Sequence, residues 1–490
     1  MSAEQAIPLC QENLSRLPAR VSVPAYSRSA LSPGVVHLSV GSFHRSHQAV
    51  YFDALARRGE RDWGIVGIGL RRPRLRAALA PQDGLYTVVA RGAGDDEARV
   101  IGAMTSYLLA PSDQEVALAA LADPRTALVT LTITASAYAL DAPAEPHAWP
   151  RGLDSAPSSA LAYVVEALDR RRRRGVAPFT VLSCDNLPDN GTVAREALVT
   201  CAARRDARFA AWIEANVEFP NSMVDRITPQ TSLADREMVA RDFGVLDRWP
   251  VITEQFSQWL VQERFCNRRP PLDEVGVQFV DDVTPYALMK TRLLNASHCA
   301  IGFLGSLAGL RRADEVMRDP VFSRYVLQLM RAEVAPLLPR VAGIDLASYT
   351  STLIERLSNP KIADELERLC RGGSSKVPTH VLPSIECARD RGSEHRLLTM
   401  AVAGWFRYLR GSDERGRPTA LDDPLATELR AAALRGGSDP RPLLSRCSGF
   451  EKLADDPGFV TALETALVAL DRDGARAAVA SRLAHGGLAA

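Results

Sequence analysis

The chain has 490 residues, of which 46% are hydrophobic and 24% are charged, a composition typical of a folded protein and unlike that of a disordered or fibrous one. Its 59 basic and 58 acidic residues leave a formal charge of +1, so no overall field favours nucleic acid or an anionic membrane as a partner. A single hydrophobic core stops growing at roughly 250–300 residues, and this length therefore predicts two domains.

The sequence carries no signal for export, membrane insertion or metal binding. The N-terminal residues lack the basic start and apolar centre of a secretory signal, and no run of 18 apolar residues occurs. The eight cysteines are scattered singly, and His44 and His47 lack the HExxH context of a zinc site. We therefore expect a cytoplasmic protein with reduced cysteines, no membrane segment and no bound metal.

The first part of the chain alternates between strand and helix patterns. The run VVHLSV at 35–40 predicts a buried strand, a helix follows through Leu55, and GIVGIGL at 64–70 predicts a second strand. The other predicted elements are strands at 86–90, 126–134, 179–184 and 277–280 and a helix at 159–171. This alternation favours a doubly wound parallel sheet.

The pattern changes near residue 285, after which the segments are amphipathic and helical. We expect these helical segments at 287–310, 320–338, 398–410 and 459–484. The sequence thus predicts an α/β domain over 1–284, followed by a mostly α-helical domain over 285–490.

The turn after the first strand is a candidate dinucleotide site. A strand that ends in a glycine turn before a helix can hold a pyrophosphate on its backbone N–H groups. Here the turn contains Val40, Gly41, Ser42 and Phe43, and Gly41 supplies one of the three glycines of the usual fingerprint. A plain strand-to-helix turn is the alternative interpretation.

The residues after the second strand bear on the choice of cofactor. An NAD enzyme normally has an acidic residue here to bind the ribose 2′-hydroxyl, whereas an arginine accommodates the 2′-phosphate of NADP. This chain has no acidic residue there and offers Arg72 and Arg74 instead. The sequence therefore favours NADP over NAD, with a surface cluster of arginines that binds no ligand as the alternative.

The segment KTRLLNASH contains the candidate catalytic groups. Lys290 is one of four lysines in a chain with 59 basic residues, and a lysine, unlike an arginine, can give up its proton near neutral pH. On an α-helix, Asn295 lies roughly 140° and His298 roughly 80° from Lys290, so that the three share one broad face. The rest of the helix is apolar, and buried polar groups need a partner or a ligand.

These residue types suit the oxidation of an alcohol. A lysine can take the hydroxyl proton as hydride leaves the carbon, and an asparagine amide can donate to the developing alkoxide. A second candidate pair, Asp185 and Asn186, follows a predicted strand in SCDNLPDNG at 183–191. That position is the carboxyl edge of the sheet, where α/β proteins bind ligands.

Taken together, these segments resemble the long-chain, metal-independent polyol dehydrogenases, a family that includes mannitol 2-dehydrogenases and hexuronate reductases. The resemblance covers nearly the whole chain. It is carried by VVHLSVGSFHRSHQAVYFDAL (35–55), SCDNLPDNG (183–191), FPNSMVDRITP (219–229), VDDVTPY with KTRLLNASH (280–298) and GGSSKVPTHVLPSI (372–385).

The resemblance implies a Rossmann-type dinucleotide-binding domain and a helical substrate-binding and catalytic domain with a polyol site in the cleft between them. It implies that Lys290 is the general acid and base, that Asn186 and Asn295 form an oxyanion hole, and that His298 orients the reacting oxygen. The implied substrate ligands are Asp225, Arg368 and Lys376. NAD or NADP is the implied cofactor, a polyol or ketose is the only implied partner, and the implied state is a monomer.

Three segments depart from the family pattern. Ser39 replaces the first glycine of the fingerprint, and the family's Thr-Glu-x-Gly-Tyr reads Thr134, Ala135, Ser136, Ala137, Tyr138. The acidic residue that commonly precedes the catalytic lysine is absent from 285–289, where Ala287 stands. These losses leave substrate preference and working pH open.

The leading hypothesis is a zinc-independent oxidoreductase that interconverts a mannitol-like polyol and a fructose-like ketose. A hexuronate reductase is the close alternative, because Arg368 and Lys376 could hold a carboxylate. Two other classes remain open: a lyase that forms a Schiff base on Lys290, and a sugar- or nucleotide-binding homologue that has lost catalysis.

Overall fold

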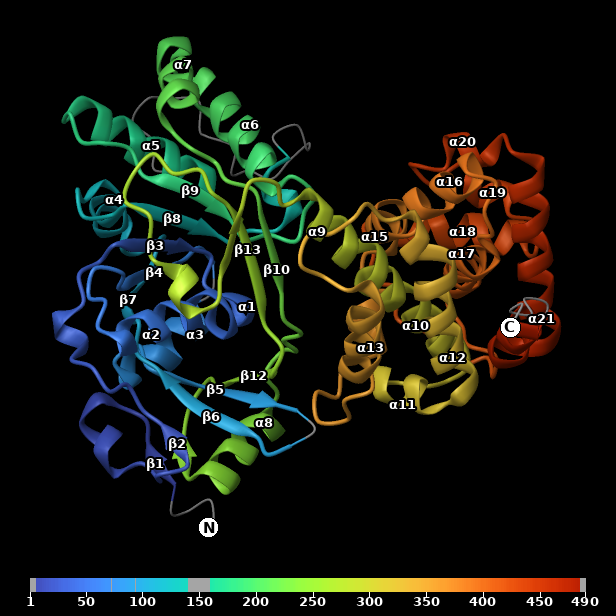
Figure 1. Cartoon of the computed structure of the whole chain (residues 1–490), viewed down its shortest axis with the longest axis horizontal. Helices are drawn as coiled ribbons and strands as arrows, with labels where there is room; N and C mark the ends of the chain where they lie inside the picture. The colour runs from blue at the N-terminus through green and yellow to red at the C-terminus, as the bar shows by residue number, and fades with distance from the viewer. Residues whose placement is uncertain (1–5, 72, 93, 140–158, 485–490) are drawn as a thin grey trace. The chain divides into compact units, whose positions relative to one another are not determined.

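The computed structural model describes residues 6–71, 73–92, 94–139 and 159–484 (Figure 1). The chain forms two compact units, residues 1–284 and 285–490. The first contains all the strands among the described residues, and the second is helical. Arg72, one of the two arginines predicted to select the cofactor, lies outside the described residues.

A five-stranded parallel sheet forms the centre of the first unit. Its order is β7-β4-β3-β8-β9, and each neighbouring pair is parallel. The strands are β3 (Val35–Leu38), β4 (Ile65–Gly69), β7 (Met104–Leu109), β8 (Leu128–Leu131) and β9 (Thr180–Ser183). The order reverses between β3 and β8, which makes their carboxyl ends the switch point of a Rossmann-type fold. The predicted fold class is confirmed.

Helices cover both faces of this sheet, as the alternating side chains of a strand require. Val36 and Leu38 pack in one core with apolar residues of the later helices, whereas Val35 packs in a second core with residues of the earlier helices. The earlier helices are α2 (Gln48–Arg58), which follows the short α1 (Ser42–Ser46), and α3 (Pro73–Leu79). The later ones are α4 (Gln114–Ala122), α5 (Ala160–Arg173), α6 (Asn190–Ala203) and α7 (Ala207–Asn216).

Three smaller sheets complete the first unit. Their orders are β12-β5-β6-β2, β10-β13-β14 and β1-β11. Their bounds are β1 (Ile7–Pro8), β2 (Val21–Ser22), β5 (Tyr86–Arg91), β6 (Glu97–Ile101), β10 (Ser222–Asp225), β11 (Val245–Leu246), β12 (Val251–Glu254), β13 (Gln258–Gln262) and β14 (Gln278–Val280). The strands predicted at 86–90 and 277–280 exist, but they lie in the two larger of these sheets and not in the parallel one. An apolar run shows that a strand is buried and not which strand it pairs with.

The second unit is built from helices. The segments predicted at 287–310, 320–338, 398–410 and 459–484 are all mainly helical. The principal helices are α9 (Thr284–Lys290), α10 (Ala296–Leu307), α11 (Ala313–Arg318), α12 (Pro320–Gln328), α13 (Leu346–Leu357), α14 (Leu366–Cys370), α15 (Gly373–His380), α16 (Leu382–Asp390), α17 (Arg396–Tyr408), α18 (Ala426–Gly436), α19 (Arg441–Leu444), α20 (Glu451–Ala454) and α21 (Pro457–Ala484).

The packing of α10 against α17 shows why the second unit is close-packed. A Cβ added at Gly404 of α17 would lie 2.9 Å from the Leu304 side chain of α10, so a larger residue there would displace that leucine. The long helix α21 bends at Gly474, whose φ of +77° favours glycine. No helix among the described residues combines the length and the apolar character needed to cross a membrane.

Candidate active site

The predicted cofactor turn lies at the switch point of the parallel sheet. β3 ends at Leu38, and the turn leads directly into α1, whose first N–H groups have no partner within the helix. A Cβ added at Gly41 would meet only the Ser39 carbonyl oxygen, at 3.9 Å, so one side of the turn is open. Val40 is buried, whereas Gly41, Ser42 and Phe43 are half-buried. This geometry fits the close approach of a phosphate to the backbone.

The end of β4 carries arginines and no acidic residue among its described positions. Arg74 is exposed in the first turn of α3. Arg74 is therefore available to a ligand at the carboxyl edge of the sheet.

The end of β9 presents Asp185 and Asn186, as predicted from the sequence. The Asp185 carboxylate accepts hydrogen bonds from the backbone N–H groups of Ile133 and Thr134, at 3.1 and 2.7 Å, and from the Tyr138 hydroxyl at 2.7 Å. Burial raises the pKa of Asp185, and these hydrogen bonds oppose the rise. Asp185 thus fixes the segment after β8 to the strand end that leads into Asn186.

Asp225 is the last residue of β10 and is buried. The same strand is attached to the end of β9, because the Ser222 hydroxyl donates to the Ser183 carbonyl oxygen at 2.6 Å. The Asn190 amide also donates to the Ser222 carbonyl oxygen at 3.0 Å. The first unit therefore holds Asn186 and Asp225 on elements joined by hydrogen bonds.

In the second unit, Lys290 ends α9 and Asn295 directly precedes α10. Between them lies a π-helical turn, η8 (Thr291–Asn295), in which the Ala296 N–H bonds to the Thr291 carbonyl five residues earlier. The expectation of an uninterrupted α-helix is wrong, because the extra residue in the turn widens it. The i→i+5 spacing places residue 295 one turn above residue 290, and turns of this kind are frequent at functional sites.

Two polar atoms in this segment have no hydrogen-bond partner among the described residues. They are the amide nitrogen of Asn295 and Nε2 of His298, and both are buried. An unsatisfied buried polar group carries a free-energy penalty of about 1–3 kcal/mol. Lys290 is only 7% exposed. A ligand that offers oxygen atoms to Asn295 and His298 would remove the penalty.

His298 is uncharged near neutral pH. Burial lowers its pKa well below the ordinary value, and the neighbouring cations Arg368, Arg356, Lys376 and Lys290 lower it further. The predicted residues of the second unit therefore lie close enough to interact electrostatically around His298.

The two cationic side chains that are predicted to bind substrate have different hydrogen-bond partners. Arg368 forms a bidentate ion pair with Asp364, with 2.6 Å between Nε and Oδ1. Nζ of Lys376 donates to the Leu369 carbonyl oxygen at 3.1 Å. Burial lowers the pKa of Lys376, with Arg368 adding to the effect.

Two residues near this cluster were not identified from the sequence. Arg356 is buried on α13 and acts on His298, but one arginine among so many gives no signal. His380 ends α15, four residues after Lys376, and its pKa is lowered to about 3 by burial and by Lys290 and Lys376. The i, i+4 spacing from Lys376 was the available sequence signal for His380.

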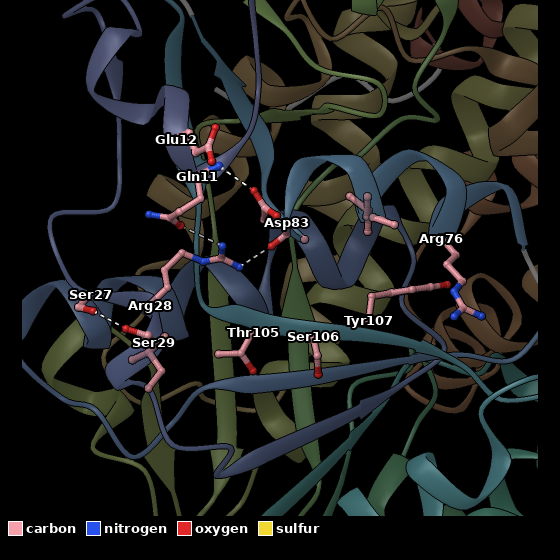
Figure 2. A pocket seen from close by; sticks show the side chains of 14 residues that line it. Gln11, Glu12, Ser27, Arg28, Ser29, Arg76, Asp83, Thr105, Ser106 and Tyr107 are labelled. Atoms are coloured by element: carbon pink, nitrogen blue, oxygen red, sulfur yellow. Dashed lines mark hydrogen bonds between the residues drawn. The ribbon is translucent and has the colours of Figure 1, made fainter.

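A cavity of about 890 Å³ lies elsewhere in the first unit, beside β7 (Figure 2). The polar groups that line it bond to one another: Arg28 donates to the Asp83 carbonyl oxygen at 2.7 Å and to Gln11 Oε1 at 3.1 Å, while the Gln11 N–H donates to the Asp83 carboxylate at 2.9 Å. Of the predicted site residues that the structure describes, none lines this cavity. We therefore do not assign it to the candidate active site.

Two protein-family models together match most of the chain. Residues 33–274 match the family model of the mannitol dehydrogenase Rossmann domain, and residues 282–471 match that of the mannitol dehydrogenase C-terminal domain. The chain belongs to the mannitol dehydrogenase family. The predicted resemblance is thereby confirmed.

Similar proteins in this family include a mannitol 2-dehydrogenase of Phaeosphaeria nodorum, 44% identical over 96% of this chain and 85% of its own length. A mannitol 2-dehydrogenase of Aspergillus fumigatus is 42% identical over 95% of this chain and 97% of its own. The solved structure of Pseudomonas fluorescens mannitol 2-dehydrogenase with NAD and D-mannitol has a TM-score of 0.90 and 40% identity, covering 98% of this chain and 100% of its own.

Among the described residues, no group of three or more histidines, cysteines and carboxylates could hold a metal ion. The candidate catalytic side chains are a lysine, amides and an uncharged histidine. These are groups that move a proton and stabilise an oxyanion.

Proposed function

We propose that this chain oxidises a mannitol-like polyol to a fructose-like ketose, reversibly, with a nicotinamide dinucleotide as the redox partner. The observation that supports this most directly is the pair of buried atoms on Asn295 and His298 that have no hydrogen-bond partner among the described residues, in the segment that begins with Lys290. The relatives named mannitol 2-dehydrogenase, and the Pseudomonas complex with NAD and D-mannitol, support the substrate and the cofactor.

Each residue has a distinct role in this proposal. Lys290, in its neutral form, takes the proton from the reacting hydroxyl, and returns it in the reverse direction. The amide N–H groups of Asn295 and Asn186 donate to the alkoxide that develops on the same oxygen. The uncharged ring of His298 holds that oxygen in line for Lys290. A bound dinucleotide would supply the acceptor for the hydride that leaves the carbon.

Substrate hydroxyls away from the reacting carbon would be held by Asp225, Arg368 and Lys376. Two cations and a carboxylate supply both donors and acceptors, as a polyol needs. Lys376 Nζ has three donors and contacts the carbonyl oxygens of Arg368 and Leu369, at 3.4 and 3.1 Å, so donor capacity remains for a hydroxyl.

We propose that the turn of Val40, Gly41, Ser42 and Phe43 holds the pyrophosphate. Its open side at Gly41, and the first N–H groups of α1, which have no partner within the helix, support this. The absence of an acidic residue after β4, and the exposed Arg74, support the use of NADP. The Pseudomonas relative was solved with NAD, so both cofactors enter the test.

The test is an initial-rate assay of the purified chain with mannitol, sorbitol, arabinitol and fructuronate, each with the matching oxidised or reduced form of both cofactors. Wild-type turnover of mannitol that is lost in Lys290→Ala supports the proposal. Lys452→Ala is the matched control, because Lys452 is exposed on α20 and has no proposed role. Turnover of fructuronate without turnover of any polyol would instead identify a hexuronate reductase.

A further inference from the structure

A buried histidine connects two strands directly beneath the proposed cofactor turn. His37 lies on β3 and is fully buried. Its Nδ1 lies 2.8 Å from the hydroxyl oxygen of Thr130, and its Nε2 lies 3.0 Å from the hydroxyl oxygen of Thr132. Both threonines belong to β8 or follow it directly, so His37 joins the two strands at the switch point.

The hydrogen bonds determine which ring nitrogen carries the proton. The Thr132 hydroxyl donates its single proton to the Ser39 carbonyl oxygen, at 3.0 Å. Its oxygen must therefore accept from His37, which places the proton on Nε2. Nδ1 then accepts the proton of the Thr130 hydroxyl. Every polar group in the chain Thr130, His37, Thr132 and Ser39 is satisfied in this one arrangement.

His37 keeps this arrangement because it stays uncharged. Burial lowers its pKa to about 3, with the Ser39 backbone opposing part of the effect. The ring also stacks on His44 of α1, with 3.4 Å between the ring centroids and 13° between the planes. The orientation of His37 is therefore fixed by two threonines and by the helix that follows the turn.

Ser39 has a backbone conformation that needs support from neighbouring groups. Its φ is +72°, a conformation that glycine adopts freely and serine adopts only under constraint. The constraint comes from both sides: the Ser39 N–H donates to the Ile68 carbonyl oxygen at 2.8 Å, and the Ser39 carbonyl accepts from Thr132. The direction of the next N–H groups, from Val40 onward, depends on this conformation.

We propose that His37 is a positioning residue for the cofactor: it holds the Thr132 hydroxyl, which holds the Ser39 carbonyl and so sets the turn that binds the pyrophosphate. At position 39 a glycine would adopt this backbone conformation freely. In this chain His37 and Thr132 hold a serine in it instead. The inference rests on the proposed function, because it assumes that a dinucleotide binds at this turn.

Three variants test it, with NADH and NADPH as the titrants in a fluorescence binding assay. Thr132→Val removes the hydroxyl that holds Ser39, and we expect affinity for the preferred cofactor to fall by about tenfold, the equivalent of one hydrogen bond. Thr126→Val is the matched control: it removes a buried threonine hydroxyl that donates to the Ala120 carbonyl oxygen at 2.9 Å and has no bond to His37 or Ser39, and we expect affinity within twofold of wild type. In Ser39→Gly/Thr132→Val, glycine needs no constraint, and affinity should recover.

The outcomes separate this inference from the proposed function. Wild-type protein that binds neither reduced cofactor overturns both. Wild-type binding with equal losses in Thr132→Val and Thr126→Val, or with no recovery in the double variant, overturns the positioning role alone, because a merely structural effect would not be relieved by glycine at position 39. Melting temperatures of the three variants show whether a loss of affinity follows from a loss of folding.

Discussion

The Tyr138 hydroxyl lies 2.7 Å from a carboxylate oxygen of Asp185 and 2.9 Å from the hydroxyl oxygen of Ser183. These contacts attach the segment after β8 to the end of β9, one residue before Asn186. Tyr138 is buried, so its hydroxyl has no access to bulk water as an alternative partner. The position of Asn186 therefore depends on a tyrosine far from it in the sequence.

Tyr138→Phe should weaken both folding and catalysis. The variant leaves the Asp185 carboxylate with one donor fewer in a buried place, at a free-energy cost of about 1–3 kcal/mol. The pKa of Asp185, already raised by burial, should rise further because the tyrosine hydrogen bond lowers it. Chemical denaturation measures the first effect, and kcat with mannitol at saturating cofactor measures the second.

The control for this variant is Tyr163→Phe. The Tyr163 hydroxyl donates to the Ala110 carbonyl oxygen at 3.0 Å and touches neither Asp185 nor the end of β9. We expect a comparable loss of stability without a change in kcat. Equal kcat losses in the two variants would contradict a specific role for Tyr138.

Asn295→Ala should lower kcat by about 10²–10³ while leaving cofactor affinity unchanged, as when one donor to an oxyanion is removed. Ser297→Ala is the matched control on the same helix, because the buried Ser297 hydroxyl already donates to the Leu293 carbonyl oxygen at 2.6 Å. We expect that control to keep near-wild-type kcat. Steady-state rates and NADH titrations of both variants check the prediction.

Thr134→Gly should stabilise the protein. Thr134 has φ +72° and ψ 158°, a region used almost only by glycine, and the strain of a side chain there is about 1–3 kcal/mol. Relief of this strain should exceed the roughly 0.5–1 kcal/mol that a glycine costs through the conformational entropy it loses on folding. Ala135→Gly is the control, since Ala135 is not among the residues with positive φ and should only lose stability. Thermal denaturation compares the two.

Much of the fold could be predicted because burial on both faces leaves a clear pattern. β3 and β4 are buried throughout, and their apolar runs showed this directly. The membership of β5 in a different sheet could not be predicted, since strand pairing depends on contacts distant in sequence. The π-helical turn after Lys290 was also missed, because periodicity assumes a constant helical pitch.

The candidate site also contains some residues that could be predicted from the sequence and others that could not. Lys290, Asn295 and His298 could be proposed from the sequence because they are close together in it and chemically unusual in an apolar helix. The role of His37 could not, because its two partners lie more than ninety residues away and only the structure brings them together. Residue types predict chemistry, whereas hydrogen-bonded support of a turn requires coordinates.

Arg74→Ala should change cofactor choice if Arg74 binds the 2′-phosphate. The KM for NADP should rise by about tenfold, the loss of one exposed charge-assisted contact, while the KM for NAD stays the same. Arg208→Ala is the control, because Arg208 is equally exposed but lies on α7. Equal changes for the two cofactors would exclude a role of Arg74 in selecting between them.

Glu333 should make the stability of the protein decrease with rising pH. Its buried carboxylate accepts hydrogen bonds from the backbone N–H groups of Leu397 and Leu398, at 2.8 and 2.9 Å, where α17 begins. Burial outweighs these hydrogen bonds and raises the pKa of Glu333 from 4.5 to about 7. The folded state thus holds a proton that the unfolded state releases between these two values.

The sign follows from this difference. The stability contributed by protonated Glu333 is fully present below pH 4.5 and is lost as the pH rises through 7, a change on the order of 3 kcal/mol. Glu333→Gln keeps a carbonyl acceptor for the helix N–H groups but cannot ionise, so its free energy of unfolding should fall less than that of the wild type over this range. Glu394→Gln, an exposed carboxylate beside the same helix, should follow the wild type. Urea denaturation at pH 5 and pH 8 measures the difference, and parallel pH profiles of wild type and Glu333→Gln would show that Glu333 is already ionised at pH 5.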